Sequence, residues 1–298
     1  MSFSTEAVNL EIPKKCYQHQ NGEIWIGDAI KWLQFQKSNS VDLIFAAPPY
    51  NIKKADWDTF ESQQHYVDWS LKWIEQASRI LKPTGSLYVC GFSEILADIK
   101  LPALRYFKSC KWLIWHYKNK ANLSNDWGRS HESILHFRKT KNFQLNIDNI
   151  RIPYSSHTLK YPEHPQAETS QYGNKGKNDG RVWNPHPKGA KPRDVIEIPT
   201  TCNGMNEKTK HPTQKPEELV RKFVLSSSSR GDTVVDPFVG SGTTLVVAEQ
   251  LGRKWLGCDI VPQYLDSAIK RIEFAKKMKD EEWFWFDRKN EERRKNIR

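Results

Sequence analysis

The chain of 298 residues has no long apolar segment. No run approaches the roughly 20 residues that a helix needs to cross a bilayer, which argues against a membrane protein. Residues 1–15 include acidic side chains and lack the basic-then-apolar order of a secretory signal. We therefore expect a protein of the cytoplasm that makes no membrane contact.

Cysteine is scarce, and its spacing excludes two kinds of stabilised small domain. The cysteines are odd in number and form no Cys-x-x-Cys pair, so we expect neither a disulfide framework nor a zinc site, and no other metal. Scattered, reduced thiols are typical of cytosolic proteins. The five positions are Cys16, Cys90, Cys110, Cys202 and Cys258.

Acidic residues are outnumbered. The chain has 46 Lys and Arg against 35 Asp and Glu, giving a net charge of +11 and a pI of about 9.3. This balance favours a polyanionic partner, with nucleic acid ahead of an anionic membrane surface, although a merely soluble basic protein would also show it. A hydrophobic fraction of 38% suffices for a core. We expect one large domain, or one with a substantial insertion.

Short apolar strands alternate with amphipathic helices over most of the chain, which predicts a doubly wound, mostly parallel α/β sheet of Rossmann type. The buried strand at 41–46 must end at Pro48 and Pro49, because proline cannot donate to a sheet ladder. Residues 82–85 are expected to stop a helix and turn. The remaining elements are strands at 24–28, 86–90, 112–117, 133–137, 233–235 and 254–258, and helices at 29–35, 65–81, 216–226, 245–251 and 264–279.

Residues 140–210 interrupt this pattern. They are rich in Pro, Asn, Gly, Lys and His, and carry a single short apolar run at 195–198. Seventy residues of plain loop would be unusual in a compact domain, so this segment is predicted to be a linker or a functional insertion.

A nucleoside-binding pattern follows the strand at 233–235. Gly240 and Gly242 form a Gly-x-Gly turn into a helix, and Asp259 ends the next strand. Glycine lets the backbone approach a ligand, and the acidic side chain can accept ribose hydroxyls. Position 245 is Leu245, so the third glycine of the dinucleotide fingerprint is missing and NAD is disfavoured. Asp236, just before the turn, could meet an ammonium group.

The segment Asp236-Pro-Phe-Val-Gly-Ser-Gly-Thr-Thr244 resembles the cofactor motif of S-adenosylmethionine-dependent DNA amino-methyltransferases, which act on adenine N6 or cytosine N4. Pro48-Pro49-Tyr50 resembles the end of their catalytic motif, usually Asp-Pro-Pro-Tyr for adenine and often Ser-Pro-Pro-Tyr for cytosine. The segments 211–216 and 131–135 are similar to two further blocks of the family. The catalytic motif comes first and the cofactor motif second, an order that resembles the permuted β group.

This resemblance implies a permuted class I methyltransferase fold: a catalytic half at 1–139, a target-recognition insertion at 140–210, a cofactor half at 211–279 and a charged tail at 280–298. It also implies roles in binding S-adenosylmethionine. Asp259 would hold the ribose, Asp28 would lie by the adenine, and Lys215 would lie near the pocket. The methionine and adenosyl parts would contact Asp236, Phe238, Gly240, Gly242 and Thr243.

The catalytic tetrapeptide is Ala47-Pro48-Pro49-Tyr50. An exocyclic amine is a poor nucleophile because its lone pair is conjugated into the ring. Two acceptors aimed at its N–H bonds correct this: a side-chain oxygen at the first position, and the Pro48 carbonyl that the rigid Pro-Pro holds. Tyr50 would stack on a base flipped out of the duplex. Alanine cannot accept a hydrogen bond, so we expect an enzyme inactivated at this position with binding retained, or a natural pseudoenzyme.

Adenine N6 is the expected target, because Phe45-Ala46 and Asn51 resemble the adenine enzymes, and cytosine N4 stays open. An RNA-modifying enzyme of related fold is disfavoured by the large insertion. A cognate restriction endonuclease and a homodimer are further partners to consider. The expected location is a prokaryotic cytoplasm, at the nucleoid.

Cations within or near the insertion are expected to contact double-stranded DNA, although a solvated polar loop is the alternative. The C-terminal residues 288–298 are expected to be a solvated helix or an extra grip on phosphate, with the aromatic residues at 283–286 docking the tail on the core. The expected DNA-contacting residues are Arg129, Lys175, Lys177, Arg181, Lys188, Lys191 and Arg193.

Overall fold

The structure is a computed structural model that describes residues 11–117, 127–162, 164–165 and 182–296. The chain divides into two compact units. The first comprises residues 1–146 and 193–280, and the second comprises residues 147–192 and 281–298. The expected boundaries at 139 and 210 differ from this division, because residues 193–210 return to the first unit and the tail residues 281–298 group with the insertion.

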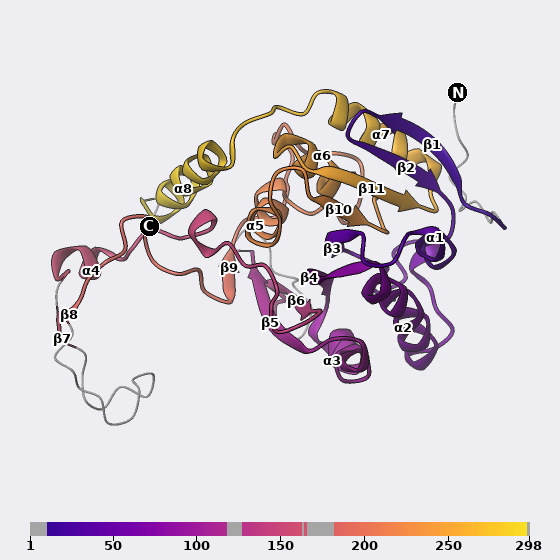
Figure 1. Ribbon diagram of the computed structural model, residues 1–298, viewed down its shortest axis with the longest axis horizontal. Coiled ribbons are helices and arrows are strands. Elements are labelled where there is room, and N and C mark those ends of the chain that lie inside the picture. Colours follow the sequence, from indigo (N-terminus) through magenta and orange to yellow (C-terminus); the bar gives the residue numbers. More distant parts are fainter. Residues whose placement is uncertain (1–10, 118–126, 163, 166–181, 297–298) are drawn as a thin grey trace. The chain divides into compact units, whose positions relative to one another are not determined.

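A mostly parallel sheet forms the centre of the first unit (Figure 1). Its five middle strands are parallel, β1 and β6 run antiparallel to their neighbours, and β9 is parallel to β5. Within the described residues the order across the sheet is β1 (Lys14–His19), β2 (Gly22–Ile26), β11 (Lys254–Asp259), β10 (Thr233–Asp236), β3 (Val41–Ala46), β4 (Leu81–Gly91), β6 (His131–Arg138), β5 (Ser109–His116) and β9 (Val195–Glu197).

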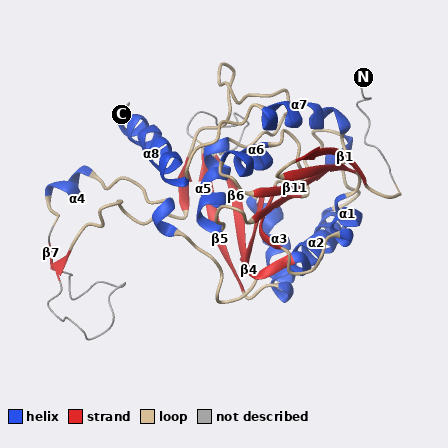
Figure 2. Ribbon diagram, turned by 45° about the horizontal axis from the view of Figure 1, so that its top comes forward, coloured by secondary structure: helices blue, strands red, loops and turns tan. Residues whose placement is uncertain are grey.

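Helices cover both faces of this sheet (Figure 2). One layer holds α1 (Ala29–Phe35), α2 (Gln63–Ile80) and α3 (Ser93–Ala103), and the other holds α5 (Glu217–Ser227), α6 (Thr243–Gln250) and α7 (Pro262–Glu273). All six residues of β3 are buried, as expected of a parallel strand packed on both sides. The predicted doubly wound α/β fold is confirmed.

Three local differences from the sequence-based expectations have physical explanations. β4 begins at Leu81, so 82–85 is an irregular stretch of strand rather than a free turn, and the register between β3 and β4 shifts there. β9 joins the main sheet beside β5, where the indole of Trp115 donates to the Ile198 carbonyl. β1 was not expected, because its mostly polar sequence lacks the apolar alternation of a half-buried strand.

The topology creates a switch point between β10 and β3. From β10 the chain passes through α6 to β11 on one side, and from β3 it passes through α2 to β4 on the other. In open α/β sheets, ligands bind beyond the carboxyl ends of the strands at such a point. The loops that follow these two strands are therefore the expected position of a ligand-binding site.

The second unit contains short elements and one long helix. These are a 3₁₀ turn at Ile147–Asn149, α4 (Ser156–Lys160), the paired strands β7 (His164–Pro165) and β8 (Val182–Trp183), and α8 (Asp280–Asn296), of which all but the first residue belongs to this unit. Among the described residues, no helix is long and apolar enough to cross a membrane. Within the same part of the chain, no group of three or more His, Cys, Asp or Glu side chains could hold a metal ion.

Candidate active site

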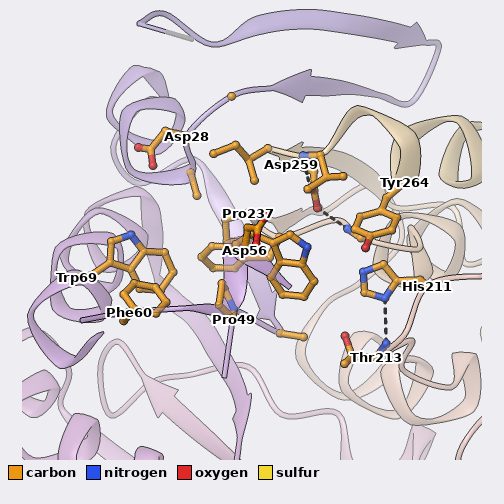
Figure 3. Close-up of a pocket in the computed structure, with 18 residues that line it drawn as sticks. Asp28, Pro49, Asp56, Phe60, Trp69, His211, Thr213, Pro237, Asp259 and Tyr264 are labelled. Carbon is orange, nitrogen blue, oxygen red and sulfur yellow. Dashed lines mark hydrogen bonds between the residues drawn. The ribbon is translucent and has the colours of Figure 1, made fainter. Parts of the chain in front are cut away.

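A pocket of about 310 Å³ lies at the carboxyl edge of the sheet, where β2, β3, β10 and β11 end (Figure 3). Ala47 and Pro49 of the catalytic tetrapeptide belong to its wall, so the expected cofactor site and the expected reaction site share one cavity. Its lining consists of Gly27, Asp28, Ala29, Ala47, Pro49, Asp56, Trp57, Phe60, Trp69, His211, Thr213, Pro237, Phe238, Gly240, Asp259, Ile260, Val261 and Tyr264.

Asp259 and Gly240 are joined directly at one wall of the pocket. The Gly240 amide donates to Oδ2 of Asp259 at 2.6 Å, and the Val261 amide donates to Oδ1 at 2.9 Å. Burial raises the pKa of Asp259 to about 6, against the lowering effect of these amides. Gly240 has φ +48°, and a Cβ there would lie 2.8 Å from Nε2 of His211. Glycine is therefore required both by the backbone and by the space.

Asp236 ends β10 behind this wall. Its carboxylate accepts the Phe238 amide at 2.9 Å and is almost fully buried. Burial is the main cause that raises its pKa to about 7, and the neighbouring Asp259 adds to it. Such a carboxylate is stabilised by an incoming cationic group, because the cation offsets the cost of burying the negative charge.

Aromatic side chains make up much of the rest of the wall. Trp57 lies roughly parallel to His211 with ring centroids 6.4 Å apart, and Tyr264 meets His211 edge-on at 4.3 Å. Burial lowers the pKa of His211 to about 4, so the ring is neutral at physiological pH. Trp69 packs against Phe238 across the same cavity. Flat apolar walls with carboxylates at the edge suit a ligand that combines a heterocycle, a ribose and a charged group.

The loop after the tetrapeptide is held by one buried carboxylate, Asp58. Its Oδ1 accepts the amides of Tyr50 and Asn51 at 2.6 and 2.8 Å. Its Oδ2 accepts the amides of Ile52 and Lys54 at 3.3 and 3.1 Å. Asn51 and Lys53 have φ values of 56° and 57°, in the left-handed region that costs non-glycine residues energy. Four bonds to a single side chain therefore fix a strained turn.

Tyr50 is enclosed in a cluster of its own. The ring is 6% exposed, its hydroxyl donates to Glu132 at 2.8 Å, and Phe92 meets it edge-on at 5.2 Å. The Lys215 ammonium lies 5.1 Å from the ring centroid and 3.3 Å from the Glu132 carboxylate. In this structure the ring expected to stack on a base is thus covered by protein groups.

Several expected cofactor residues support the pocket instead of lining it. Lys215 is directed at Glu132 and Tyr50 rather than into the cavity. The Thr243 hydroxyl donates to the Lys215 carbonyl at 3.0 Å. At Gly242, with φ +80°, a Cβ would lie 2.5 Å from the side chain of Ala268, so this glycine allows α6 and α7 to pack closely. Asp28 does line the pocket, and it also caps α1 by accepting the Lys31 amide at 2.9 Å.

The expected DNA contacts are distributed over both units. Lys188 and Lys191 are exposed in the second unit, and Arg193 is exposed at the start of the first unit's returning segment. Arg129 is paired with Glu94 at 2.8 Å and lies over the Phe92 ring at 4.0 Å, beside the Tyr50 cluster. The expected contacts Lys175, Lys177 and Arg181 lie outside the described residues.

Residue patterns alone did not single out Asp58 or the aromatic wall. Asp58 and Trp57 lie in a polar stretch after the tetrapeptide whose side chains show no periodicity. Phe60 lies between that stretch and the following helix, and Trp69 has the apolar spacing of a core helix, so nothing in the sequence separates a pocket wall from packing. His211 was noted as part of a similar block, but its position against Gly240 comes from the fold.

The family model for N6/N4 DNA methylases matches residues 41–270. The chain is a member of this family. Because the match runs from β3 into α7, it includes the tetrapeptide strand, the insertion and the cofactor turn.

Curated relatives of this N6/N4 DNA methylase agree with the assignment. It is 34% identical to the type II methyltransferase M.HpaI of Haemophilus parainfluenzae, over 83% of this chain and 72% of that protein. It is 33% identical to the DNA adenine methyltransferase YhdJ of Escherichia coli strain K12, over 86% and 84% of the two chains.

Solved structures of other methyltransferases share the fold. The cytosine-N4-specific PvuII DNA methyltransferase superposes with a TM-score of 0.66 at 20% identity, covering 94% of this chain and 95% of that one. M1.HpyAVI, solved in complex with SAM, superposes with a TM-score of 0.53 at 22% identity, covering 85% and 100%. At these identities the likeness concerns the arrangement of the chain, and chemistry has to be argued from the residues.

Proposed function

We propose that this DNA methylase is built to transfer a methyl group from S-adenosylmethionine to the N6 amine of adenine in duplex DNA, and that Ala47 impairs the transfer. The observation that carries the proposal is that the wall of one pocket includes Ala47, Pro49, Gly240 and Asp259. A ligand held at Gly240 and Asp259 would lie beside the tetrapeptide. No second cavity has to be invoked to bring the two reactants together.

The pocket fits the cofactor by two observations. Asp236, which lies behind the wall next to the lining residue Pro237, is a buried carboxylate whose pKa is raised to about 7, and such a group suits the ammonium of a methionine moiety. Gly240 and the aromatic wall of Trp57 and Phe238 leave a flat space beside Asp259 for a nucleoside. We assign Asp259 to the ribose and Asp28 to the adenine edge. When bound, S-adenosylmethionine supplies an electrophilic methyl group on a sulfonium.

The residues of the tetrapeptide would orient the target amine. The Pro48 carbonyl would accept one N–H, and the side chain at position 47 would accept the other, which alanine cannot do. Tyr66 donates its hydroxyl to the Pro49 carbonyl at 2.6 Å, and Asp58 holds the next residues, so the turn is rigid before any substrate arrives. A preorganised acceptor contributes more to the rate than one that must first be ordered.

Adenine is favoured over cytosine by two observations. Phe45-Ala46 and Asn51 flank the tetrapeptide as in the adenine enzymes that the sequence resembles. A relative at 33% identity is named a DNA adenine methyltransferase, whereas the cytosine-N4 structure shares only the fold. In either case the amine is paired inside the duplex, so the base has to be flipped out before transfer.

Ala47 itself favours a second candidate, a protein that binds cofactor and DNA without modifying them. The half-buried methyl group replaces only one acceptor, and the pocket around it is intact. We also propose a restriction endonuclease as the partner of an active form, since several relatives are named type II methyltransferases. A homodimer is a further proposal, which sedimentation of the purified protein would test.

The test is the Ala47→Asp protein beside the unaltered chain. Both are incubated with labelled S-adenosylmethionine and unmethylated genomic DNA, and cofactor binding is measured separately by calorimetry. We expect equal cofactor affinity and about 10²–10³-fold faster transfer by the Ala47→Asp protein, as when a single preorganised partner of the reacting group is regained. Nucleoside mass spectrometry then distinguishes N6-methyladenine from N4-methylcytosine.

Each outcome decides between the candidates. A folded Ala47→Asp protein that binds cofactor and remains inactive would contradict the enzyme proposal and leave the non-catalytic binder. Appearance of N4-methylcytosine would overturn the choice of adenine while keeping the enzyme. An Ala47→Ser protein is the matched control, because it restores an acceptor of the kind often found in the cytosine enzymes.

A further inference from the structure

The C-terminal helix is attached to the inserted segment by specific contacts within the second unit. Nη1 of Arg288 donates to the Lys188 carbonyl at 2.7 Å, and Nζ of Lys295 donates to the Pro153 carbonyl at 3.2 Å. Gly189 has φ +104°, and a Cβ there would lie 2.9 Å from Nη1 of Arg288. These contacts, 100 and 142 residues apart in sequence, make α8 (yellow in Figure 1) part of the insertion's own fold.

Helical spacing separates an inner from an outer face of α8. Phe284 is buried, and at 100° per residue Arg288 and Lys295 lie near it, so the contacts with the insertion come from one side. The opposite side carries Lys289 and Arg293, one turn apart and both exposed.

An aromatic ring extends this outer row. Trp285 precedes Lys289 by one turn and is 50% exposed. Two acidic residues lie near the row: Glu292, on the flank of the helix, is engaged by Arg288 at 3.2 Å, and Glu282 lies on the same side as the row, one turn before Trp285. The outer face thus presents two cations in line with one indole, over which the Arg288 guanidinium lies at 5.4 Å, and on this face the cations outnumber the carboxylates between Trp285 and Arg293.

We propose that the outer face of α8, formed by Trp285, Lys289 and Arg293, is a DNA-backbone contact surface, and that the insertion and the C-terminal helix together make one discontinuous DNA-binding unit. The inference rests on the proposed action on duplex DNA. Cations in a row on a rigid helix suit successive phosphates, and the insertion carries further exposed cations in Lys188 and Lys191.

The experiment uses the full-length protein and a labelled DNA duplex of mixed sequence, with anisotropy read from about 50 to about 200 mM salt. The test variant is Lys289→Gln with Arg293→Gln. The matched control is Lys37→Gln with Lys72→Gln, which removes the same charge from exposed positions in the first unit. A second control, Lys289→Arg with Arg293→Lys, keeps the charges of the row.

Loss of two phosphate contacts should make the slope of log affinity against log salt shallower by about 1.8, since each contact contributes about 0.9. When the salt concentration is raised fourfold, the affinity of the test variant for DNA should therefore fall by a factor about 12 times smaller than that of the unaltered protein. Both controls should keep the original slope. All proteins should show the same thermal unfolding, because the altered side chains point outward.

The outcomes separate this inference from the proposed function. Failure of the unaltered protein to bind the duplex would count against its action on DNA. Normal binding with an unchanged slope in the test variant would overturn the role of α8 alone. An equal change in the first control would show that net charge, rather than this face, determines the slope, and would also overturn it.

Discussion

Removal of the Asp58 carboxylate should free the catalytic turn, which is the turn at residues 50–54 at the end of the Ala47-Pro48-Pro49-Tyr50 tetrapeptide. Asp58 is 2% exposed, and its two oxygens accept four backbone amides from residues 50–54. In an Asp58→Ala protein these amides lose their acceptor, and Asn51 and Lys53 lose what holds them in left-handed conformations. The turn that presents Pro48 and Tyr50 would then sample other conformations.

The magnitude follows from the bond lengths and the exposure of the donors. The two Oδ1 bonds, at 2.6 and 2.8 Å, are short and charge-assisted, and we take about 1.5 kcal/mol for each. The two longer Oδ2 bonds, at 3.3 and 3.1 Å, contribute about 0.5 kcal/mol each. Water can replace the acceptor at exposed Lys54, so the free energy of unfolding should fall by about 2–4 kcal/mol.

Thermal unfolding and amide hydrogen exchange measure the two parts of this effect. At about 2 °C per kcal/mol for a chain of this size, the midpoint should fall by about 4–8 °C. Peptides covering residues 48–60 should lose protection beyond any global change. Asp58→Asn should be intermediate, because its amide keeps one oxygen, and Asp56→Ala is the control because Asp56 is an exposed carboxylate on the same 3₁₀ turn.

The reasoning would be refuted if Asp58→Ala destabilised the protein no more than Asp56→Ala and left the exchange of residues 48–60 unchanged. A fall in the midpoint without faster exchange in that segment would contradict the assignment to the turn. Loss of cofactor binding alone would point to the neighbouring pocket wall at Trp57 instead.

Three further predictions concern the pocket and its supports. Burial raises the pKa of Asp236 to about 7, so its contribution to the unfolding free energy is largest in acid and is lost as the pH rises toward 7. A cationic ligand needs the ionised carboxylate, so the affinity for S-adenosylmethionine should increase by up to about tenfold for each pH unit as the pH rises toward 7. Calorimetry in buffers of different ionisation enthalpy should detect the proton that Asp236 releases on binding. Gly240→Ala should weaken cofactor binding at least about tenfold, since the new Cβ would lie 2.8 Å from His211; unchanged affinity would refute this account of the wall. Lys215→Met should cost about 3–5 kcal/mol, because the Glu132 carboxylate keeps the Tyr50 hydroxyl but loses its cationic partner. Adding Glu132→Gln should recover most of the loss in a chemical-unfolding cycle, and additive losses would show that the pair is not coupled.

Sequence patterns predicted well where one local rule dominates. The strand at Val41–Ala46 is continuous and apolar and ends at a proline pair, and α1 at Ala29–Phe35 begins after an aspartate cap, so both bounds agree with the structure. Prediction was poorer at β1, whose polar residues owe their strand conformation to pairing with β2. The same holds for β9, which depends on β5. Pairing partners distant in sequence leave no periodic trace in either segment.

The structure brings part of the expected site together, and the reason is again the arrangement of the chain in space. Asp28, Ala47, Phe238, Gly240 and Asp259 line one pocket, because parallel strands deliver their carboxyl ends to the same edge. The Lys215 side chain points toward Tyr50 and Glu132, because the Glu132 carboxylate lies within reach of its ammonium group in the folded chain. Likewise, Asp58 acquires its role only when the loop folds back on it.

What the amino-acid sequence determined by itself is the family, the α/β fold and the presence at position 47 of alanine, whose side chain cannot accept a hydrogen bond, because each rests on residue types at short spacing. Only the tertiary structure decided that the tetrapeptide and the cofactor turn share a pocket, that Asp58 holds the catalytic turn and that α8 belongs with the insertion. Those relations join residues far apart in the chain, as between Ala47 and Gly240, which follow the adjacent strands β3 and β10 and line one pocket although they are 193 positions apart. Contacts of that range are selected by burial and hydrogen-bond satisfaction in the folded chain, and no local pattern records them.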